Sequence, residues 1–283
     1  MAPRVGLVVD STCDLPENWP YRPRIHVIPM HIRFGDTDYR EGVDITESEF
    51  YQKILTQGLV PKTSQPSPGE FADFYRQLAP QYDVILSLHL GAKLSGTYQS
   101  AVLGAQMVAD QIQVIPFDSN GGSAGVGFMA DEAFEMLDAG ATLDEVLQRL
   151  ALLRERIQII LTPKDLHFAR MSGRINALSA FVASMLRIHP IIMLEDGKLE
   201  ASQRARSRKK ALGRMVQLLQ QRLGPGPSHI AIVHAQAPEA VESLKKEVVT
   251  HLQPQKLWIA KLSSAVSSHL GPGTIGLGGY RID

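Results

Sequence analysis

Short apolar runs alternate with segments of helical periodicity along most of the chain. Residues 5–9 and 84–88 have the apolar, β-branched character of buried strands, and residues 97–108 follow helical spacing. In the second half, apolar runs at residues 230–234 and 257–262 enclose another helical segment. Strands separated by helices are typical of parallel βαβ units, so the pattern predicts an α/β fold.

Three helix starts carry a local signal. A hydroxyl residue followed three positions later by glutamate occurs at Thr46, Ser67 and Thr142. This spacing is typical of a capping box, in which the two side chains satisfy free N–H groups of the first turn. Pro68 stands at the first position of the second helix, where its missing N–H costs nothing. We also expect one strand over residues 25–32.

The end of the helix that begins at Thr142 is the predicted boundary between two α/β domains, residues 1–156 and 157–283. In the second domain, Asp196-Gly197 predicts a hairpin turn between two strands. A basic helix is expected over residues 207–223. An apolar helix over residues 177–186 fits ordinary core packing best, and lining of a ligand tunnel is the second interpretation.

Composition excludes several classes of protein. The chain has 283 residues, 44% of them hydrophobic, and its 29 basic residues balance 29 acidic ones. The chain has no net charge that would favour binding to nucleic acid or to a membrane surface. No run of apolar residues approaches the ~18 that are needed to span a membrane. The single cysteine, Cys13, cannot form an internal disulfide. We expect a soluble, cytoplasmic protein without a signal peptide.

Three runs of small hydroxyl and glycine residues follow strand-like segments, at residues 62–67, 94–97 and 267–273. Such runs leave N–H groups and hydroxyls open to an incoming oxygen, and a helix starting beyond them adds its positive end. They predict a site for a small anion, a carboxylate or a phosphate. For each serine or threonine, a turn or helix cap is the other interpretation.

Other kinds of site find little support. The glycines at 122, 125 and 127 fit neither the dinucleotide-binding nor the P-loop pattern, and the nine histidines are scattered without metal-ligand spacing. Neither Ser64 nor Ser95 lies in a G-x-S-x-G motif. An esterase or thioesterase using Ser95 or Ser64 with His269 remains the alternative function. The basic run from Arg204 to Arg214 fits a solvated helix face or a docking surface.

Six motifs together resemble the DegV family of bacterial fatty-acid-binding proteins. They occur in the order of the family and span nearly the whole chain: D-S-T at 10–12, K-T-S-Q-P-S at 62–67, L-S-G-T-Y-Q-S-A at 94–101, D-S at 118–119, G-R-I at 173–175 and H-L-G-P-G-T at 269–274. The resemblance implies two α/β domains and a buried tunnel for one long-chain fatty acid such as palmitate. Residues 168–172 and Ser268 depart from the common family pattern.

The resemblance also implies a site. Thr63 and Ser95 would bind the carboxylate of the fatty acid. The mouth of the head-group site would contain Ser64, Gly96, Thr97, Ser119, Arg174 and His269. The protein would be a carrier without catalytic residues, metal or cofactor, and without stable membrane insertion or nucleic-acid binding. Some family members present their lipid to a fatty acid kinase subunit, which Arg204, Arg206 and Arg208 would then contact.

Overall fold

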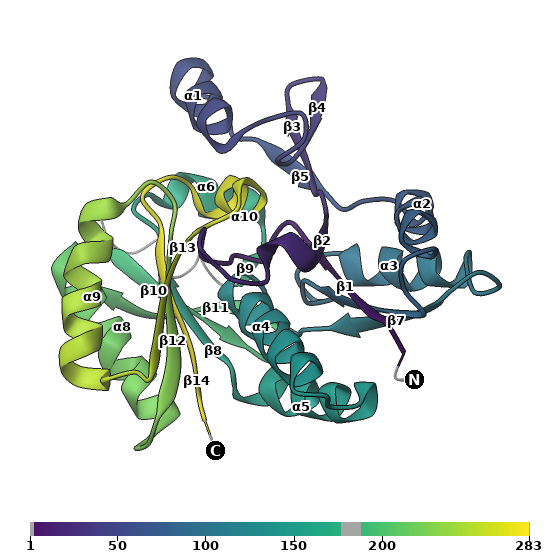
Figure 1. Cartoon of the computed structure of the whole chain (residues 1–283). Helices are drawn as coiled ribbons and strands as arrows, with labels where there is room; N and C mark the ends of the chain where they lie inside the picture. The colour runs from purple at the N-terminus through teal and green to yellow at the C-terminus, as the bar shows by residue number, and fades with distance from the viewer. Residues whose placement is uncertain (1–2, 177–187, 283) are drawn as a thin grey trace.

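The computed structural model describes residues 3–176 and 188–282. The helix expected at 177–186 lies outside these ranges. Two large β-sheets alternate with three layers of helices, and a small lobe projects from one end (Figure 1). Within the described ranges, no helix is long and apolar enough to cross a membrane.

The first sheet has four parallel strands in the order β2, β1, β6 and β7. They span Ile25–Ile28, Val5–Asp10, Val84–His89 and Gln113–Asp118, respectively. Helices α2 (Pro68–Leu78) and α3 (Thr97–Gln106) cover one face. Phe71 and Tyr75 of α2 pack there against Val8 and Ile85 of the sheet. All neighbouring strands are parallel, as the alternation of strands and helices predicted, although β1 and β2 are joined by a loop with one short 3-10 turn.

Helices α4 (Ala124–Asp138) and α5 (Leu143–Arg156) form the middle layer. Phe128 and Met129 of α4 share one core with Leu86 of β6 and with Trp258 and Tyr280 of the second sheet. One hydrophobic core therefore joins the two sheets through this pair of helices.

The second sheet has seven strands in the order β13, β12, β14, β8, β10, β11 and β9. They span Lys256–Lys261, Ser228–His234, Ile275–Arg281, Gln158–Thr162, His189–Glu195, Lys198–Ala205 and Ile175–Asn176, respectively. Helices α8 (Arg208–Leu223) and α9 (Pro238–Leu252) cover its outer face through a second core (Figure 1). The sheet is mixed, because β14 runs antiparallel to β12 and β8.

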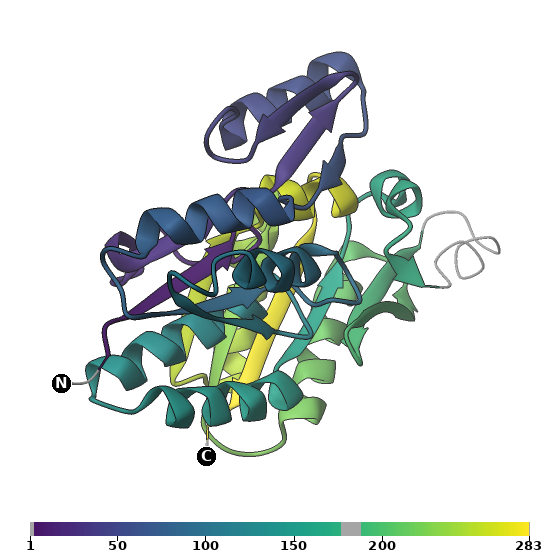
Figure 2. The same cartoon turned by 90° about the vertical axis from the view of Figure 1, so that its right-hand side faces the viewer.

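The projecting lobe, residues 31–64, contains a three-stranded antiparallel sheet and α1 (Glu47–Gln57). Its strands in spatial order are β4 (Thr37–Arg40), β3 (His31–Phe34) and β5 (Lys62–Ser64). Figure 2 shows the lobe above the helices of the main body. The short helices α6 (Leu166–Ser172) and α10 (Ser264–Leu270) lie on the side of the body that faces the lobe (Figure 1).

Local signals in the sequence were reliable. All three capping boxes form, with Thr46, Ser67 and Thr142 each accepting from the N–H of the glutamate three residues on. The hairpin at Asp196-Gly197 joins β10 to β11. These features depend on neighbours in sequence, so no tertiary contact had to be known.

Two predictions of local structure were wrong. The strand expected over residues 25–32 is two strands, because the chain leaves the first sheet after Ile28 and enters the lobe at His31. Pro29, which has no N–H for a sheet ladder, stands at the break. The run at 267–273 is not an open loop, since its first four residues belong to α10. The boundary after Arg156 stays a prediction, although the second sheet begins at Gln158.

Candidate functional site

A cavity lies between the two halves of the chain, below the lobe. Much of its wall is apolar, and the apolar residues come from both halves: Met30, Leu90, Leu94, Ile159, Leu161, Ile175, Leu194, Leu199, Ala265, Val266 and Leu270. Its polar lining comprises Thr12, Thr63, Ser64, Gln65, Ser95, Ser123, Ser172, Arg174 and His269, together with the glycine Gly122. A ligand that fits this lining has a long apolar part and a polar part.

The centre of the polar lining is a contact between two distant segments. Thr63, at the middle of β5, places its Oγ1 2.7 Å from Nε2 of His269 in the last turn of α10. Ser95 lies just before α3, and its Oγ is 2.8 Å from Oγ1 of Thr97. The first turn of α3 has no side-chain cap, because Gly96 occupies that position. Ser95 is therefore not used as a helix cap, which was its other interpretation.

The charge of this region is set by one ring and one guanidinium. Burial, together with the nearby charge of Arg174, lowers the pKa of His269 to about 4, so the ring is neutral at neutral pH. Arg174 lines the cavity directly after Gly173, which ends α6 in the left-handed conformation. Its Nη1 donates to the carbonyl of Ser172 at 2.7 Å. An anion bound here meets neutral hydroxyls, a neutral imidazole and the positive charge of Arg174.

Of the residues predicted for the mouth of the site, some line the cavity and others do not. Ser64, Arg174 and His269 line the cavity with Thr63 and Ser95. Gly96 and Thr97 are not among its lining residues; Thr97 is fully buried and contacts the sulfur of Met30.

Ser119 is likewise outside the lining. Its Oγ donates to the carbonyl of Gly121 within a turn. The predicted position of Ser119 at the mouth is therefore not supported by the geometry.

The basic run contains one residue that points inward. Arg204 and Arg206 are exposed, as a docking role requires. The guanidinium of Arg208 instead donates to the backbone carbonyls of Thr162 and Pro163 and to that of Gly273 at 2.5 Å. Arg208 thus fixes the end of β8 against the loop after α10, and its geometry does not suit contact with a partner.

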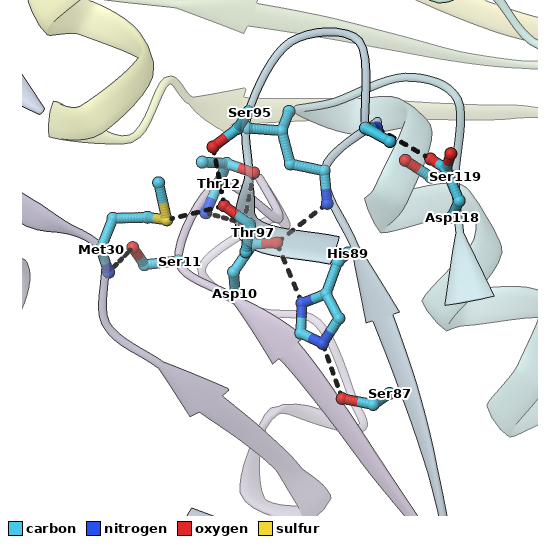
Figure 3. A network of polar contacts seen from close by, with 12 residues as sticks. Asp10, Ser11, Thr12, Met30, Ser87, His89, Ser95, Thr97, Asp118 and Ser119 are labelled. Carbon is cyan, nitrogen blue, oxygen red and sulfur yellow. Dashed lines mark hydrogen bonds and ion pairs between the residues drawn. The ribbon is translucent and has the colours of Figure 1, made fainter. Parts of the chain in front are cut away.

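Sequence reasoning missed a buried carboxylate beside the cavity. Asp10, at the end of β1, accepts from the backbone N–H and hydroxyl of Thr12 and from the N–H of Leu90, both of which line the cavity. The oxygen that accepts from Leu90, Oδ2, also lies 3.1 Å from Nδ1 of His89, whose Nε2 is 2.6 Å from Oγ of Ser87 (Figure 3). Burial alone would raise the pKa of Asp10, but His89 and the other donors outweigh it and lower the pKa.

Two further carboxylates hold the start of α10. Asp14 accepts from the N–H of Ser263 at 2.8 Å and from the hydroxyl of Ser123 at 2.5 Å. Glu41 accepts from the N–H of Ala265 at 3.1 Å. Burial raises the pKa of Asp14 well above its usual range and that of Glu41 to about 7. No short sequence pattern pointed to either residue, because their partners in and beside α10, Ser263 and Ala265, lie more than 200 positions away.

The geometry offers little for hydrolysis. Nε2 of His269 contacts Thr63, and Ser95 contacts Thr97. Among the described residues, neither serine of the esterase alternative is hydrogen-bonded to a base. Ser87, His89 and Asp10 do form a serine–histidine–aspartate chain, but all three are fully buried and Ser87 also bonds Tyr75. Over residues 3–176 and 188–282, no group of three or more histidine, cysteine, aspartate or glutamate side chains is placed to hold a metal ion.

Comparison with known proteins gives the family. The sequence model described as an uncharacterised protein of the DegV family matches residues 4–281. The chain belongs to the DegV family. Protein DegV of Bacillus subtilis is 30% identical over 275 residues, covering 96% of this chain and 98% of that protein.

Solved DegV structures share the whole fold. A Thermus thermophilus structure described as fatty acid binding of a DegV family protein has a TM-score of 0.90 and 35% identity, covering 99% of this chain and all of that one. A Eubacterium ventriosum structure described as a stearic acid-binding protein also has a TM-score of 0.90, at 25% identity and 98% coverage of both chains. The expected DegV-like α/β fold is thereby confirmed.

Proposed function

We propose that this DegV protein binds one long-chain fatty acid in the cavity between its halves. The carboxylate lies at Thr63 and Ser95, with His269, Arg174 and Ser64 around it, and the acyl chain lies along the apolar wall. The observation that carries the proposal is the pairing of a hydroxyl-lined polar region with an apolar wall in one cavity. The fatty acids bound by the Thermus and Eubacterium relatives support the choice of ligand.

The physical chemistry favours a ligand of this kind. A long acyl chain has more than a dozen methylenes, each worth ~0.8 kcal/mol when buried, and lost motion offsets part of that gain. A buried carboxylate needs hydrogen-bond donors, because an unpaired charge away from water is costly. Hydroxyls at Thr63 and Ser95 and the cation of Arg174 meet that need. The tail thus provides affinity and the head group fixes orientation.

The same site supports a carrier without catalytic activity of its own. Catalysis of ester hydrolysis needs a nucleophile hydrogen-bonded to a base, and Ser64 and Ser95 have none. Acyl-ester and acyl-CoA turnover by the purified protein tests this point directly, and we expect none above background. Measurable turnover that disappears in Ser95→Ala would favour the esterase alternative.

Presentation of the bound carboxylate to a kinase subunit is a further part of the proposal. It rests on the family resemblance and on the exposure of Arg204 and Arg206. The test is transfer of phosphate from ATP to protein-bound palmitate when the catalytic subunit of a bacterial fatty acid kinase is added. Phosphate transfer that is unchanged in the double variant Arg204→Ala with Arg206→Ala would show that these residues are not part of the interface.

Identification of the ligand is the first experiment. The protein is purified from a bacterial host and denatured, and the released small molecules are analysed by mass spectrometry. We expect close to one long-chain fatty acid per chain. An empty protein that takes up neither palmitate nor oleate would contradict the proposed function.

A variant pair tests the carboxylate site. Thr63→Ala combined with Ser95→Ala removes two neutral hydrogen bonds to the head group, each worth about 1 kcal/mol, so palmitate affinity should fall about 10- to 30-fold. Thr250→Ala is the matched control, because Thr250 is an exposed residue of α9 that bonds only the carbonyl of Lys246. Equal affinity in the double variant and the control would refute the assignment.

A further inference from the structure

Helix α10 belongs to the second half of the chain, yet the first half holds it along its length. Three residues near or in the lobe contact alternate positions of α10: Glu41 accepts from the N–H of Ala265, the hydroxyl of Tyr51 donates to Oγ of Ser267, and Thr63 bonds His269. The last of these contacts is the head-group site itself. The other two contacts hold the same helix, so they affect the position of that site.

Glu41 joins three segments at once. One carboxylate oxygen accepts from α10 at Ala265, and the other accepts from the hydroxyl of Ser11 at 2.5 Å. Oγ of Ser11 in turn accepts from the N–H of Met30, and the N–H of Glu41 donates to the carbonyl of Met30. Met30 and Ala265 both line the cavity. Glu41 does not line it, so it acts on the site only through these neighbours.

We propose that Glu41 is a positioning residue of the carboxylate site, which holds the first turn of α10 and thereby sets the ring of His269 against Thr63 and the bound head group. The inference rests on the proposed function for its ligand, and on the contacts of α10 for its geometry. It assigns a role to a residue outside the cavity wall.

The chemistry of the contact explains why a side-chain acceptor is needed at this position. The first N–H groups of a helix have no partner within the helix, and a side-chain acceptor must satisfy them. A carboxylate accepts on both oxygens, so Glu41 can bond Ala265 and Ser11 at the same time. Burial raises the pKa of Glu41 to about 7, which fits a group enclosed between packed elements. Asp10 at the end of β1, Asp14 from the loop after it and Tyr51 from α1 are the titratable groups near Glu41.

The first test uses the ligand-free protein. The ring nitrogens of His269 are observed by NMR, with assignment through His269→Gln. We expect Glu41→Ala to shift these signals, because the start of α10 loses its partner. Glu41→Gln should leave them near their original positions, since its amide oxygen can still accept from the N–H of Ala265. Asp36→Ala is the control, since Asp36 is an exposed acid of the lobe. Signals that stay unchanged in Glu41→Ala would overturn the proposal.

The second test separates the head group from the tail. We expect Glu41→Ala to weaken palmitate binding about tenfold, the equivalent of one charged hydrogen bond, and to leave 1-hexadecanol binding within about twofold. Equal weakening of both ligands would mean that Glu41 supports the cavity as a whole and would refute the positioning role. Should the alanine variant not fold, Glu41→Asp, which withdraws the carboxylate by one methylene, is expected to show the same split.

Failure of the ligand assignment has a different signature. If the unmodified protein takes up no palmitate, the proposed function is wrong. The NMR comparison on ligand-free protein then still decides whether Glu41 sets the position of His269.

Discussion

At the residue scale, the ring of His269 determines how the head-group site responds to pH. Burial with Arg174 nearby lowers the pKa of His269 to about 4, so the folded protein keeps the ring neutral where an unfolded chain, with a pKa near 6.5, would protonate it. The unfolded state then binds more protons between pH 4 and 6.5. The contribution of His269 to stability should be complete above pH 6.5 and decline as pH falls toward 4.

The variant His269→Gln tests this dependence. Each pKa unit is worth about 1.4 kcal/mol. Between pH 7 and 4, the free energy of unfolding of the wild type should therefore decrease by roughly 2–3 kcal/mol more than that of the variant. Urea unfolding at both pH values measures the difference. An equal loss in the two proteins would mean that His269 titrates normally.

Glu41 should give the opposite slope. Its pKa is raised from 4.5 to about 7 by burial, with Asp10 as a nearby like charge, so the folded state holds a proton that the unfolded state releases. Its contribution to stability is therefore fully present below pH 4.5 and is lost as pH rises to 7. In Glu41→Gln this decline should be smaller than in the wild type, as followed by urea unfolding between pH 5 and 7.5. A decline of unchanged size would assign it to Asp14, whose pKa is also raised.

At the element scale, the close packing of α2 on α3 brings the two hydroxyls of the site together. Thr63 precedes α2 and Ser95 precedes α3. The two helices approach so closely at Gly104 that an added Cβ would lie 2.5 Å from Cβ of Phe71 and 2.9 Å from the carbonyl of Pro68. Glycine at this position therefore permits the close packing of the two helices that follow Thr63 and Ser95.

Two glycine-to-alanine variants separate packing from helix propensity. Alanine at a helix interior is favoured over glycine by up to about 1 kcal/mol, whereas overpacking a core costs about 1–3 kcal/mol. Gly104→Ala should therefore lower stability by about 1–2 kcal/mol. Gly213→Ala in α8, where nothing lies within 4 Å of the new Cβ, should raise it by up to ~1 kcal/mol. Thermal unfolding of both variants measures these changes. A Gly104→Ala variant that is more stable than the wild type would contradict the close packing of α2 on α3.

At the scale of the whole molecule, the two sheets share one hydrophobic core. The core around Phe128 includes Leu86 from the first sheet and Trp258 from the second. Both halves also contribute to the cavity wall and to the contacts of α10. The predicted boundary after Arg156 separates the two sheets in sequence, but residues on both sides of it contribute to this shared core.

Calorimetry tests this view of the molecule. Because α4 and α5 belong to the cores of both sheets, we expect a single unfolding transition for the whole chain. Palmitate at about 100 times its dissociation constant should stabilise the folded state by about 2.7 kcal/mol and raise the whole transition. Two resolved transitions, of which only one responds to palmitate, would show that the halves unfold independently.

The sequence by itself determined the features that depend on near neighbours. Thr46, Ser67 and Thr142 begin helices because their partners are three residues away. The strand Val5–Asp10 follows from the apolar run that ends at Val9. The family motifs also marked the segments that contain Thr63, Ser95 and His269, and these segments do meet at one cavity.

Tertiary structure alone decided which side chains of those segments point into the cavity. Ser95 lines the cavity, whereas Thr97, two residues on, is buried beneath it. Thr63 and His269 are 206 positions apart, and Glu41 and Ala265 are 224 apart. Contacts over such separations depend on the packing of whole elements, so no local periodicity or capping signal encodes them. That is the physical reason why the sequence could mark the head-group site but could not reveal the residue that holds α10 in place.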